Sequence, residues 1–267
     1  MKNPEFLISK GVNLEKSLEL FGDIETYNET IGEFIVSAPT KISKLKEYVA
    51  TGDMSNYAIY VHSLKSDAKY FGFQKLADYA YEHEMKSKAC DIYYATENLP
   101  ALEKLVTDSV EIVKAYLTDE EEQKEEPIKT ETTDAIEFLD KTILVVDDSN
   151  IIRNFTKRIF DGQYGVGTAK DGKEAIDIIT ANKGKNNIIA ILLDLNMPKV
   201  DGFKVLEYLE QSDLFTEMPV SIISGDSTKE TIDKAFEYPI VDMLGKPFNE
   251  QDIKRVVEKT IMYKELS

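Results

Sequence analysis

The sequence has one cysteine, no tryptophan and only two histidines among its 267 residues. A single cysteine, Cys90, excludes a disulfide framework and a cysteine-cluster metal site. The longest apolar run, Ile188 to Leu193, is far too short to cross a bilayer, and no apolar signal region follows the N-terminus. Basic residues are outnumbered by acidic ones, 32 to 49, and nucleic-acid binding needs a basic surface. We therefore expect a soluble, cytoplasmic protein that binds no nucleic acid and does not insert into a membrane.

The negative charge is concentrated in one short segment. Residues 118–140 carry 2 basic and 10 acidic groups, against 13 and 18 in residues 1–117 and 17 and 21 in residues 141–267. Such a segment repels itself and buries little, so it predicts an acidic linker between two domains, 1–117 and 141–267. A solvated acidic helix that continues the preceding element is the alternative for its start, and Pro127 would end that helix.

Residues 1–117 show helical periodicity and no convincing alternation with a period of two, which predicts an all-α bundle. Asp53 is placed to cap a helix whose apolar stripe runs to Phe71, and Gly72 closes it. The pattern predicts further helices in four stretches: Asn13–Phe21, a long helix from Asp23 or Thr26 to Ala50, Gln74 to about Asn98, and about Pro100 to Leu117.

Residues 141–267 instead alternate between short apolar runs and helical patterns. Five runs are predicted to be buried parallel strands: 143–146, 165–169, 188–193, 220–223 and 240–243. Helical patterns between them include 150–160, 173–181 and 203–210. This alternation predicts a doubly wound α/β domain with a five-stranded parallel sheet. The chain as a whole is thus expected to combine an α domain with an α/β domain.

Polar side chains follow the predicted strands. Asp147 and Asp148 follow the first strand and Asp194 the third, whereas Ser224 ends the fourth and Lys246 follows the fifth. Because the C-terminal ends of parallel strands share one edge, these groups should lie together. Three carboxylates repel one another unless a cation joins them, and Mg²⁺ suits a few protein oxygens plus phosphate. Each residue alone is also explained as a helix cap or a loop residue. Their position at one edge of the predicted sheet instead favours a site for phosphoryl transfer.

Residues 141–265 resemble the receiver domain of two-component response regulators, a flavodoxin-like fold. The resemblance rests on Leu-Val-Val-Asp147-Asp148-Ser, Asp171-Gly-Lys-Glu-Ala, Leu-Leu-Asp194-Leu-Asn-Met197-Pro198-Lys-Val-Asp201-Gly202, Ser224-Gly-Asp and Lys246-Pro247-Phe. It implies that Asp194 is the phosphoacceptor. It also implies that Asp148 and Asp194 hold Mg²⁺ with the backbone carbonyl of Asn196, that Asp147 acts mostly through water, and that Lys246 neutralises the phosphoryl group.

The same resemblance implies finer features of this site. Ser224 would donate to a phosphoryl oxygen, and the Lys246–Pro247 peptide would be cis. Met243 stands where the family has a switch aromatic, so the usual coupling of that aromatic to the serine is not implied. Asn196 and Asp226 occupy the two positions that tune hydrolysis, and they resemble the fast-turnover chemotaxis type. We therefore expect a short-lived phosphoaspartate.

His62 lies off the apolar stripe of its helix, with Lys65, Ser66 and Lys69 three, four and seven residues further on. This spacing predicts an exposed imidazole beside two ammonium groups and a small residue. A neutral imidazole is a nucleophile near pH 7, and the lysines would support a phosphoryl group on it. A solvated helix face with an incidental histidine is the alternative.

The surrounding sequence resembles the histidine phosphotransfer (HPt) signature over about residues 8–117. It reads Val-His62-Ser-Leu-Lys65-Ser66-Asp-Ala-Lys-Tyr-Phe71-Gly72-Phe-Gln-Lys-Leu76, and Glu84, which lies 22 residues after the histidine, also matches. Ser66 replaces the usual glycine and is still small enough for a receiver to dock. The resemblance implies that His62 carries the phosphoryl group.

Three further features are interpreted as structural. His83 falls where the family has a core leucine or methionine, and we expect it to be packed in the interior. Cys90 is interpreted as a core filler rather than a redox site. The pattern Gly162-Gln-Tyr-Gly165-Val-Gly167 resembles a phosphate loop, but it precedes a strand and is therefore predicted to be a turn.

These patterns predict a phosphorelay protein that passes phosphoryl groups between His62 and Asp194, without a kinase catalytic domain or an output domain. Its receiver would assist its own phosphorylation and dephosphorylation. The expected partners are a sensor histidine kinase and other receiver proteins, and the oligomeric state is left open. A linker reach of roughly 25–30 Å would permit exchange within one chain. The alternatives are a docking module that works without phosphorylation and an aspartate-nucleophile phosphohydrolase, although the latter class has an aspartate where this chain has Asn196.

Overall fold

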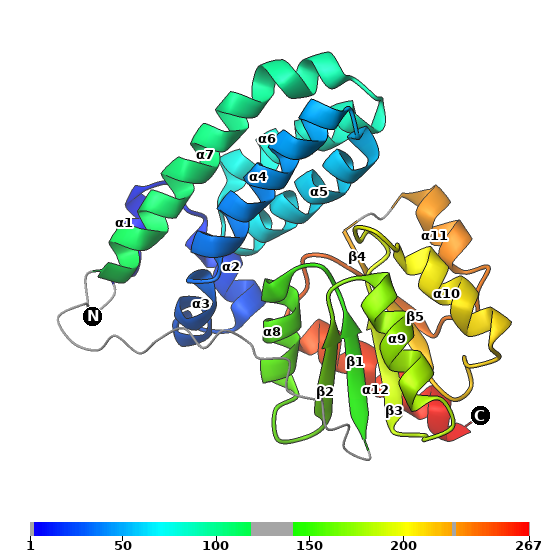
Figure 1. The fold of residues 1–267 in the computed structure, drawn as a ribbon. Coiled ribbons are helices and arrows are strands. Elements are labelled where there is room, and N and C mark those ends of the chain that lie inside the picture. The colour runs from blue at the N-terminus through cyan, green and yellow to red at the C-terminus, as the bar shows by residue number, and fades with distance from the viewer. Residues whose placement is uncertain (1–2, 119–140, 226–227, 267) are drawn as a thin grey trace. The chain divides into compact units, whose positions relative to one another are not determined.

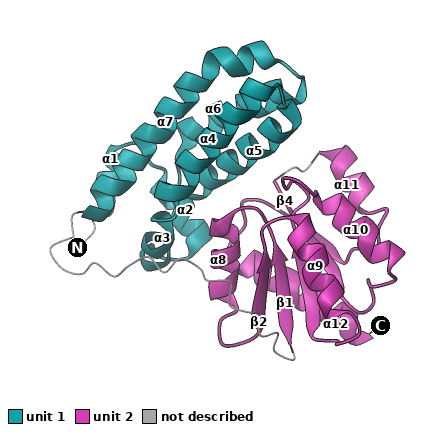
Figure 2. Cartoon of the chain, viewed as in Figure 1, with its two compact units in different colours: residues 1–137 teal, residues 138–267 magenta. Residues whose placement is uncertain are grey.

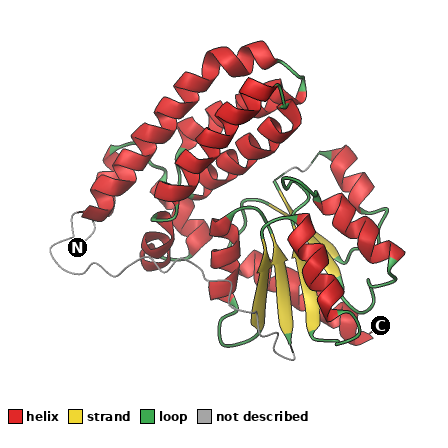
Figure 3. Ribbon diagram, viewed as in Figure 1, coloured by secondary structure: helices red, strands yellow, loops and turns green. Residues whose placement is uncertain are grey.

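The computed structural model describes residues 3–118, 141–225 and 228–266. The chain divides into two compact units, residues 1–137 and residues 138–267 (Figures 1 and 2). In the described parts, the first unit contains helices only and the second contains the strands (Figure 3). Among the same residues, no helix combines the length and the apolarity needed to span a bilayer. The expected linker lies outside the described residues, except for Thr118.

The first unit is built around an antiparallel four-helix bundle. Its helices are α1 (Pro4–Ser9), α2 (Leu14–Phe21), α3 (Ile24–Ile31), α4 (Phe34–Thr51), α5 (Met54–Tyr70), α6 (Gln74–Lys88) and α7 (Ile92–Thr118). Helices α4 to α7 form the bundle, in which α4 packs on α5, α5 on α6, α6 on α7 and α7 on α4. This arrangement confirms the helical bundle predicted from periodicity.

The starts of these helices follow the local sequence signals. Asn13 caps α2 by accepting from Lys16 N–H at 3.2 Å, and Asp53 caps α5 by accepting from Asn56 N–H at 3.0 Å. Gly72, which follows α5, takes a φ of +77°, and a Cβ there would lie 2.6 Å from the carbonyl oxygen of Asn13. Only glycine therefore fits between α5 and α2.

Two helix boundaries differ from the prediction. The long helix expected to reach Ala50 is broken at Gly32 into α3 and α4, because glycine is a poor helix former. The helix expected to reach Asn98 ends at Lys88, and α7 begins at Ile92 and runs through Pro100. The physical reason is the turn at Cys90, which takes a φ of +56°, followed by Asp91, whose side chain accepts from Tyr94 N–H at 2.9 Å.

The interpretation of Cys90 as a core filler is therefore wrong. The residue is exposed because it lies in the turn between α6 and α7 rather than on the buried face of a helix.

An aromatic cluster joins the short N-terminal helices to the bundle. Phe71, at the end of α5, lies 5.6–5.9 Å from the rings of three residues, measured between centroids: Phe21, Tyr27 and Phe34. The Tyr27 hydroxyl also donates to the Phe71 carbonyl at 3.2 Å. These rings are almost fully buried, so α2 and α3 share a core with α4 and α5.

The second unit is a parallel sheet with helices on both faces. Its elements are β1 (Thr142–Val146), α8 (Asn150–Ile159), β2 (Gly165–Ala169), α9 (Gly172–Asn182), β3 (Ile188–Leu193), α10 (Gly202–Gln211), β4 (Val220–Ser224), α11 (Lys229–Ala235), β5 (Asp242–Gly245) and α12 (Glu250–Leu266). The strand order is β2-β1-β3-β4-β5. Helices α9 and α10 pack on one face, and α8 and α12 on the other (Figure 1).

This arrangement confirms the doubly wound five-stranded fold predicted from the alternating pattern. Strands β1 and β3 are buried along their whole length, which explains their continuous apolar runs. The fifth strand begins at Asp242, two residues later than expected, and it pairs with β4 alone at the edge of the sheet.

Candidate functional site

The acidic cluster lies where the two central strands end. Asp147 and Asp148 follow β1, and Asp194 follows β3. The backbone still belongs to the ladder at these positions: Asp147 N–H donates to Ala169 O at 3.0 Å, and Asp194 N–H donates to Val146 O at 2.8 Å. One carboxylate oxygen from each of the three aspartates lies within 4.8 Å of the others. The sheet therefore assembles the three carboxylates predicted to share this edge.

Lys246 reaches into this cluster from the end of β5. Its Nζ lies 2.6 Å from Asp194 Oδ2 and 2.6 Å from Asp147 Oδ2, and its side chain is only 4% exposed. The Lys246–Pro247 peptide is cis, as predicted. Ser224, at the end of β4, is 1% exposed. The structure thus brings together the residues at the ends of β1, β3 and β5, with Ser224 ending the strand between β3 and β5.

Burial and charge act against each other in this site. Burial raises the pKa of Asp147 to about 7, and the charges of Asp194 and Asp148 add to the rise, while Lys246 opposes it. For Lys246, burial disfavours the ammonium group, but the three aspartates outweigh burial and hold its pKa above the ordinary range. Three carboxylates thus face one ammonium group, so the site has an excess of negative charge.

A divalent cation fits this donor set. The three side chains offer carboxylate oxygens, and hard cations such as Mg²⁺ prefer oxygen ligands. Asp147 Oδ1 already accepts from Ser149 N–H at 2.9 Å, whereas its Oδ2 faces Lys246. Asn196 N–H donates to Asp194 Oδ1 at 3.1 Å, which keeps Asn196 next to the cluster. The residues present are therefore compatible with the Mg²⁺ site that receiver domains carry.

Sequence reasoning missed one cationic residue beside this cluster. The Arg153 guanidinium, on α8, donates to the carbonyl oxygen of Asp147 at 2.5 Å and also to the side chain of Asn150. An arginine one turn after the acidic pair was visible in the sequence, but nothing there indicated that it folds back on the backbone. It fixes the start of α8 to the end of β1.

The two remaining expectations about this site have different outcomes. Met243, in the position of the switch aromatic, is partly buried and packs against the core formed with α9 and α10. Asp226 lies outside the described residues, so the expectation of fast hydrolysis stays a prediction.

His62 lies on α5 and contacts α6. Its Nδ1 is 2.9 Å from Glu84 Oε1, and two lysines bind the same carboxylate: Lys65 Nζ is 2.6 Å from Oε2 and Lys88 Nζ is 2.9 Å from Oε1. The expectation of an exposed imidazole is wrong, because His62 is 4% exposed. Helix α6 packs along α5 and places Glu84 beside the ring.

Glu84 determines which ring nitrogen of His62 carries the proton and which carries the lone pair. Burial disfavours its ionised form, but the hydrogen bond from His62 and the charges of His62 and Lys65 outweigh burial and hold its pKa well below the ordinary range. An ionised carboxylate only accepts hydrogen bonds, so the proton of a neutral His62 ring belongs on Nδ1. The lone pair is then on Nε2, which is buried and has no hydrogen-bond partner among the described residues.

The other residues of this helix face have different surroundings. Ser66 is 7% exposed, and its hydroxyl donates to the His62 carbonyl at 3.1 Å. Lys69 is partly buried, and burial together with the charges of Lys65 and Lys16 lowers its pKa. Lys16 comes from α2, so the positive charge near this face is drawn from two helices.

His83 is a core residue, as predicted. It is fully buried, its Nδ1 lies 2.7 Å from the Tyr57 hydroxyl, and its ring lies 5.3 Å and 5.2 Å from the rings of Tyr79 and Tyr94. Burial lowers its pKa to about 4, so the ring is neutral at pH 7.

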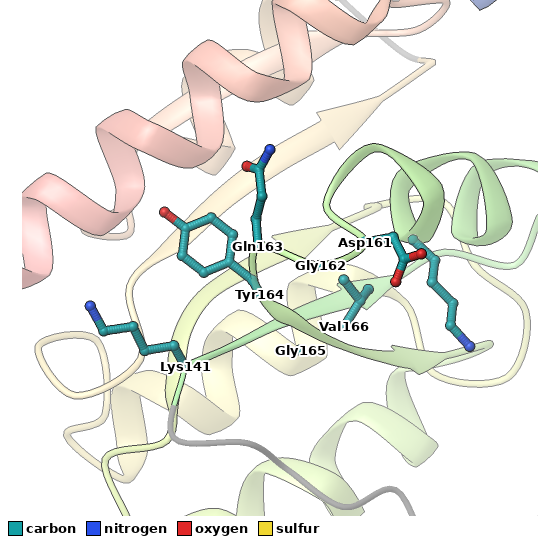
Figure 4. Close-up of a pocket in the computed structure, with 8 residues that line it drawn as sticks. Lys141, Asp161, Gly162, Gln163, Tyr164, Gly165 and Val166 are labelled. Atoms are coloured by element: carbon teal, nitrogen blue, oxygen red, sulfur yellow. The ribbon is translucent and has the colours of Figure 1, made fainter.

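The glycine pattern that resembled a phosphate loop begins in a turn at Gly162, as predicted, and its Gly165 and Gly167 belong to β2. A hollow of about 640 Å³ lies beside this turn, lined by Lys141, Asp161, Gly162, Gln163 and Tyr164 among others (Figure 4). It lies near the N-terminal ends of β1 and β2, whereas the acidic cluster lies at the C-terminal edge. A strand follows these glycines, so no helix N-terminus is available to bind phosphate here.

Comparison with known proteins assigns both units to families. The model of the response regulator receiver domain matches residues 143–258, and the model of the Hpt domain matches residues 29–118. The probable methanogenesis regulatory protein FilR2 of Methanothrix harundinacea is 31% identical over 128 residues, which cover 45% of this chain and 81% of that protein. The two-component response regulator ORR3 of Oryza sativa is 30% identical over 121 residues, which cover 45% of this chain and 90% of that protein.

A solved structure shows the same likeness. The receiver domain of the Francisella response regulator 1452 is 30% identical, with a TM-score of 0.41, over 48% of this chain and 99% of that chain. The two family matches and the relatives FilR2 and ORR3 show that the chain belongs to the two-component response regulators and is a phosphorelay protein in which an Hpt domain precedes a receiver domain.

Proposed function

We propose that His62 and Asp194 are the two phosphoryl-carrying residues of this protein. The observation that carries the proposal is the contact of Asp194 with Lys246 inside the cluster formed with Asp147 and Asp148. His62 is the matching site in the helical unit, because Glu84 leaves its Nε2 as the nucleophilic nitrogen.

At the receiver, a carboxylate oxygen of Asp194 attacks the phosphorus of a phosphohistidine. The bond from oxygen to phosphorus forms while the phosphorus–nitrogen bond breaks, and the bonding pair stays on the imidazole nitrogen of the donor. Lys246 offsets the charge of the transferred group, and Ser224 donates to one of its oxygens. Mg²⁺, held by Asp148, Asp194 and the Asn196 carbonyl with Asp147 acting through water, would neutralise charge that one lysine cannot.

At the helical unit, Nε2 of His62 gives or takes the phosphoryl group. Glu84 holds the proton on Nδ1 and balances the positive charge that the ring gains when Nε2 is phosphorylated. Lys65 is bound to Glu84 at 2.6 Å, so it neutralises that carboxylate. Lys69 forms no ion pair within the described residues, and it is the lysine that supports the phosphoryl oxygens, with Ser66 leaving room for the docking domain.

The partners follow from the two domain types. Hpt and receiver domains imply interaction with histidine kinases and with other receiver or Hpt proteins. We infer that a phosphorylated kinase or Hpt protein donates to Asp194, and that His62 exchanges with Asp194 or with the receiver of a partner.

The test is phosphotransfer from a promiscuous histidine kinase to wild type, H62Q and D194N, with the labelled residue identified by its chemical stability. Phosphohistidine is acid-labile, whereas phosphoaspartate is alkali-labile. Wild type should carry both labels and H62Q only the aspartate label. D194N should carry no label from the kinase alone, because His62 receives its phosphoryl group from an aspartate, and a histidine label should appear when a phosphorylated partner receiver is added. Equal labelling of all three would contradict the proposal. Binding of partners without any labelling would instead support a docking module, and steady hydrolysis of a generic phosphoester would support a phosphohydrolase.

A further inference from the structure

The loop between β3 and α10 begins at the proposed phosphoacceptor and is fastened at its base and at its tip. At the base, Gly202 N–H donates to Leu195 O at 3.0 Å, and a Cβ on Gly202 would lie 2.3 Å from the carbonyl oxygen of Asp194. At the tip, Gly172 N–H, from the first residue of α9, donates to Val200 O at 3.0 Å. The shape of the loop is therefore set partly by α9.

A side-chain bridge reinforces the tip of the loop. Lys199 Nζ donates to Asp171 Oδ2 at 2.6 Å, and the Asp171 side chain is 5% exposed. The other oxygen of Asp171 caps α9 by accepting from Glu174 N–H at 3.0 Å. One largely buried carboxylate thus joins the start of α9 to the loop that carries Asp194.

The backbone conformation of Lys199 indicates that its side chain has a functional role. Lys199 takes a φ of +67°, a left-handed conformation that glycine adopts without steric cost and lysine rarely adopts. A glycine here would satisfy the backbone better, so any benefit of the lysine comes from its side chain. The contact that this side chain makes is the one with Asp171.

We propose that Asp171 and Lys199 are positioning residues for the divalent cation, an inference that rests on the proposed function. Asn196 lies three residues before Lys199, and its N–H donates to Asp194 Oδ1 at 3.1 Å. The bridge holds the loop tip so that the Asn196 carbonyl and the Asp194 carboxylate keep the arrangement that binds the cation. Neither Asp171 nor Lys199 touches the cation or the phosphoryl group.

The test uses three variants of the full chain. K199G removes the ammonium group and relieves the backbone, K199R keeps a cation that can reach Asp171, and K173A removes an exposed i,i+4 pair with Asp177 on the same helix. Mg²⁺ affinity is measured by calorimetry. Phosphorylation of Asp194 by a small acyl phosphate is measured at limiting and at saturating Mg²⁺, and the unfolding midpoint is measured without metal.

K199G should weaken Mg²⁺ binding three- to tenfold and slow phosphorylation at limiting Mg²⁺, with recovery at saturating Mg²⁺. Its unfolding midpoint without metal should be unchanged or higher, because relief of the backbone offsets the lost ion pair, so the weaker Mg²⁺ binding would not result from lost stability. K199R should restore the affinity, and K173A should match wild type. Wild-type affinity in K199G, no rescue by K199R, or an equal loss in K173A would overturn the inference alone. If wild type itself binds no Mg²⁺ and accepts no phosphoryl group at Asp194, the proposed function fails as well.

Discussion

The two candidate sites have opposite charge patterns. Around Glu84, one carboxylate is surrounded by His62, Lys65 and Lys88, whereas around Lys246 one ammonium group is surrounded by three aspartates. The histidine site therefore has positive charge of its own for a phosphoryl group. The aspartate site lacks it, because its nucleophile is itself anionic and lies among other carboxylates. The difference explains why only the second site calls for a metal ion.

Removal of divalent cations should produce the largest difference between the two sites. Transfer from a prephosphorylated Hpt protein to Asp194 should fall by about a thousandfold or more in excess chelator, because the single charge of Lys246 does not offset three carboxylates. A phosphoryl group already on His62 should keep its lifetime under the same conditions. The measurement is the amount of each labelled species against time. Chelator-resistant transfer to Asp194 would show that Lys246 alone balances the site.

Replacing Lys246 should have the next largest effect. In K246M, transfer to Asp194 should fall by about a hundredfold, as expected when one preorganised charge at a phosphoryl site is lost. Mg²⁺ binding should be retained or tightened, because the carboxylates lose a competing cation. K254M, which removes a partly exposed lysine paired with Glu250, is the control and should behave as wild type. An equal loss of Mg²⁺ binding and of transfer in K246M would indicate a folding defect instead.

The buried histidine His83 provides a comparison within the helical unit. Its pKa in the folded state is about 4, below the ordinary value of 6.5, so the unfolded chain binds more protons between these values. The free energy of unfolding should therefore be insensitive to His83 well above pH 6.5 and should fall by about 3 kcal/mol as the pH falls to 4. Denaturant titrations of wild type and H83L over this range measure it. A slope in H83L as steep as in wild type would assign the pH dependence to other groups.

Glu84 should show a smaller effect on transfer. In E84Q the amide can also donate, so the Nδ1 tautomer of His62 is no longer enforced, and phosphorylation of His62 should slow by about tenfold. E82Q is the matched control, since Glu82 lies two residues earlier on α6 and accepts from the Tyr94 hydroxyl instead. The rates are measured with a phosphorylated receiver as donor. If E84Q and E82Q transfer equally fast, the orienting role of Glu84 is excluded.

Much of the aspartate site was predictable because it depends on strand ends. Asp147, Asp148 and Asp194 follow continuous apolar runs, and a parallel sheet brings the C-terminal ends of such runs to one edge whatever the details of packing. The contact of Lys246 with two of these carboxylates follows from the same rule. The bridge from Lys199 to Asp171 was not predictable, because it joins two loops separated by a strand and a helix.

The histidine site was predicted less well. Spacing along α5 placed His62, Lys65 and Lys69 on one helix face, but it could not say which helix packs there. The structure shows that α6 packs beside this face, where Lys65 binds Glu84, and that His62 is buried. Helical periodicity defines a face relative to its own axis and contains no information about the neighbouring axis.

The helix boundaries were also only partly predictable from the sequence. The caps at Asn13 and Asp53 were visible because a cap needs only its own residue and the next turn. The end of α6 was not visible, because Cys90 adopts a left-handed turn that its residue type does not favour, and Pro100 remains inside α7. Tertiary packing overrode the local preference at both positions.

The sequence by itself determined the two domain types, the acidic segment between them, the grouping of the aspartates and the lysine at one edge of the sheet, and the choice of the histidine and the aspartate that we propose as phosphoryl carriers. These features depend on residue type, periodicity and spacing, which are local. Only the tertiary structure decided that Glu84 holds Nδ1 of His62, that Lys65 serves this carboxylate, and that Lys199 fastens the loop of Asp194 to α9. Those pairings join residues from separate elements, and their distances are set by how the elements pack.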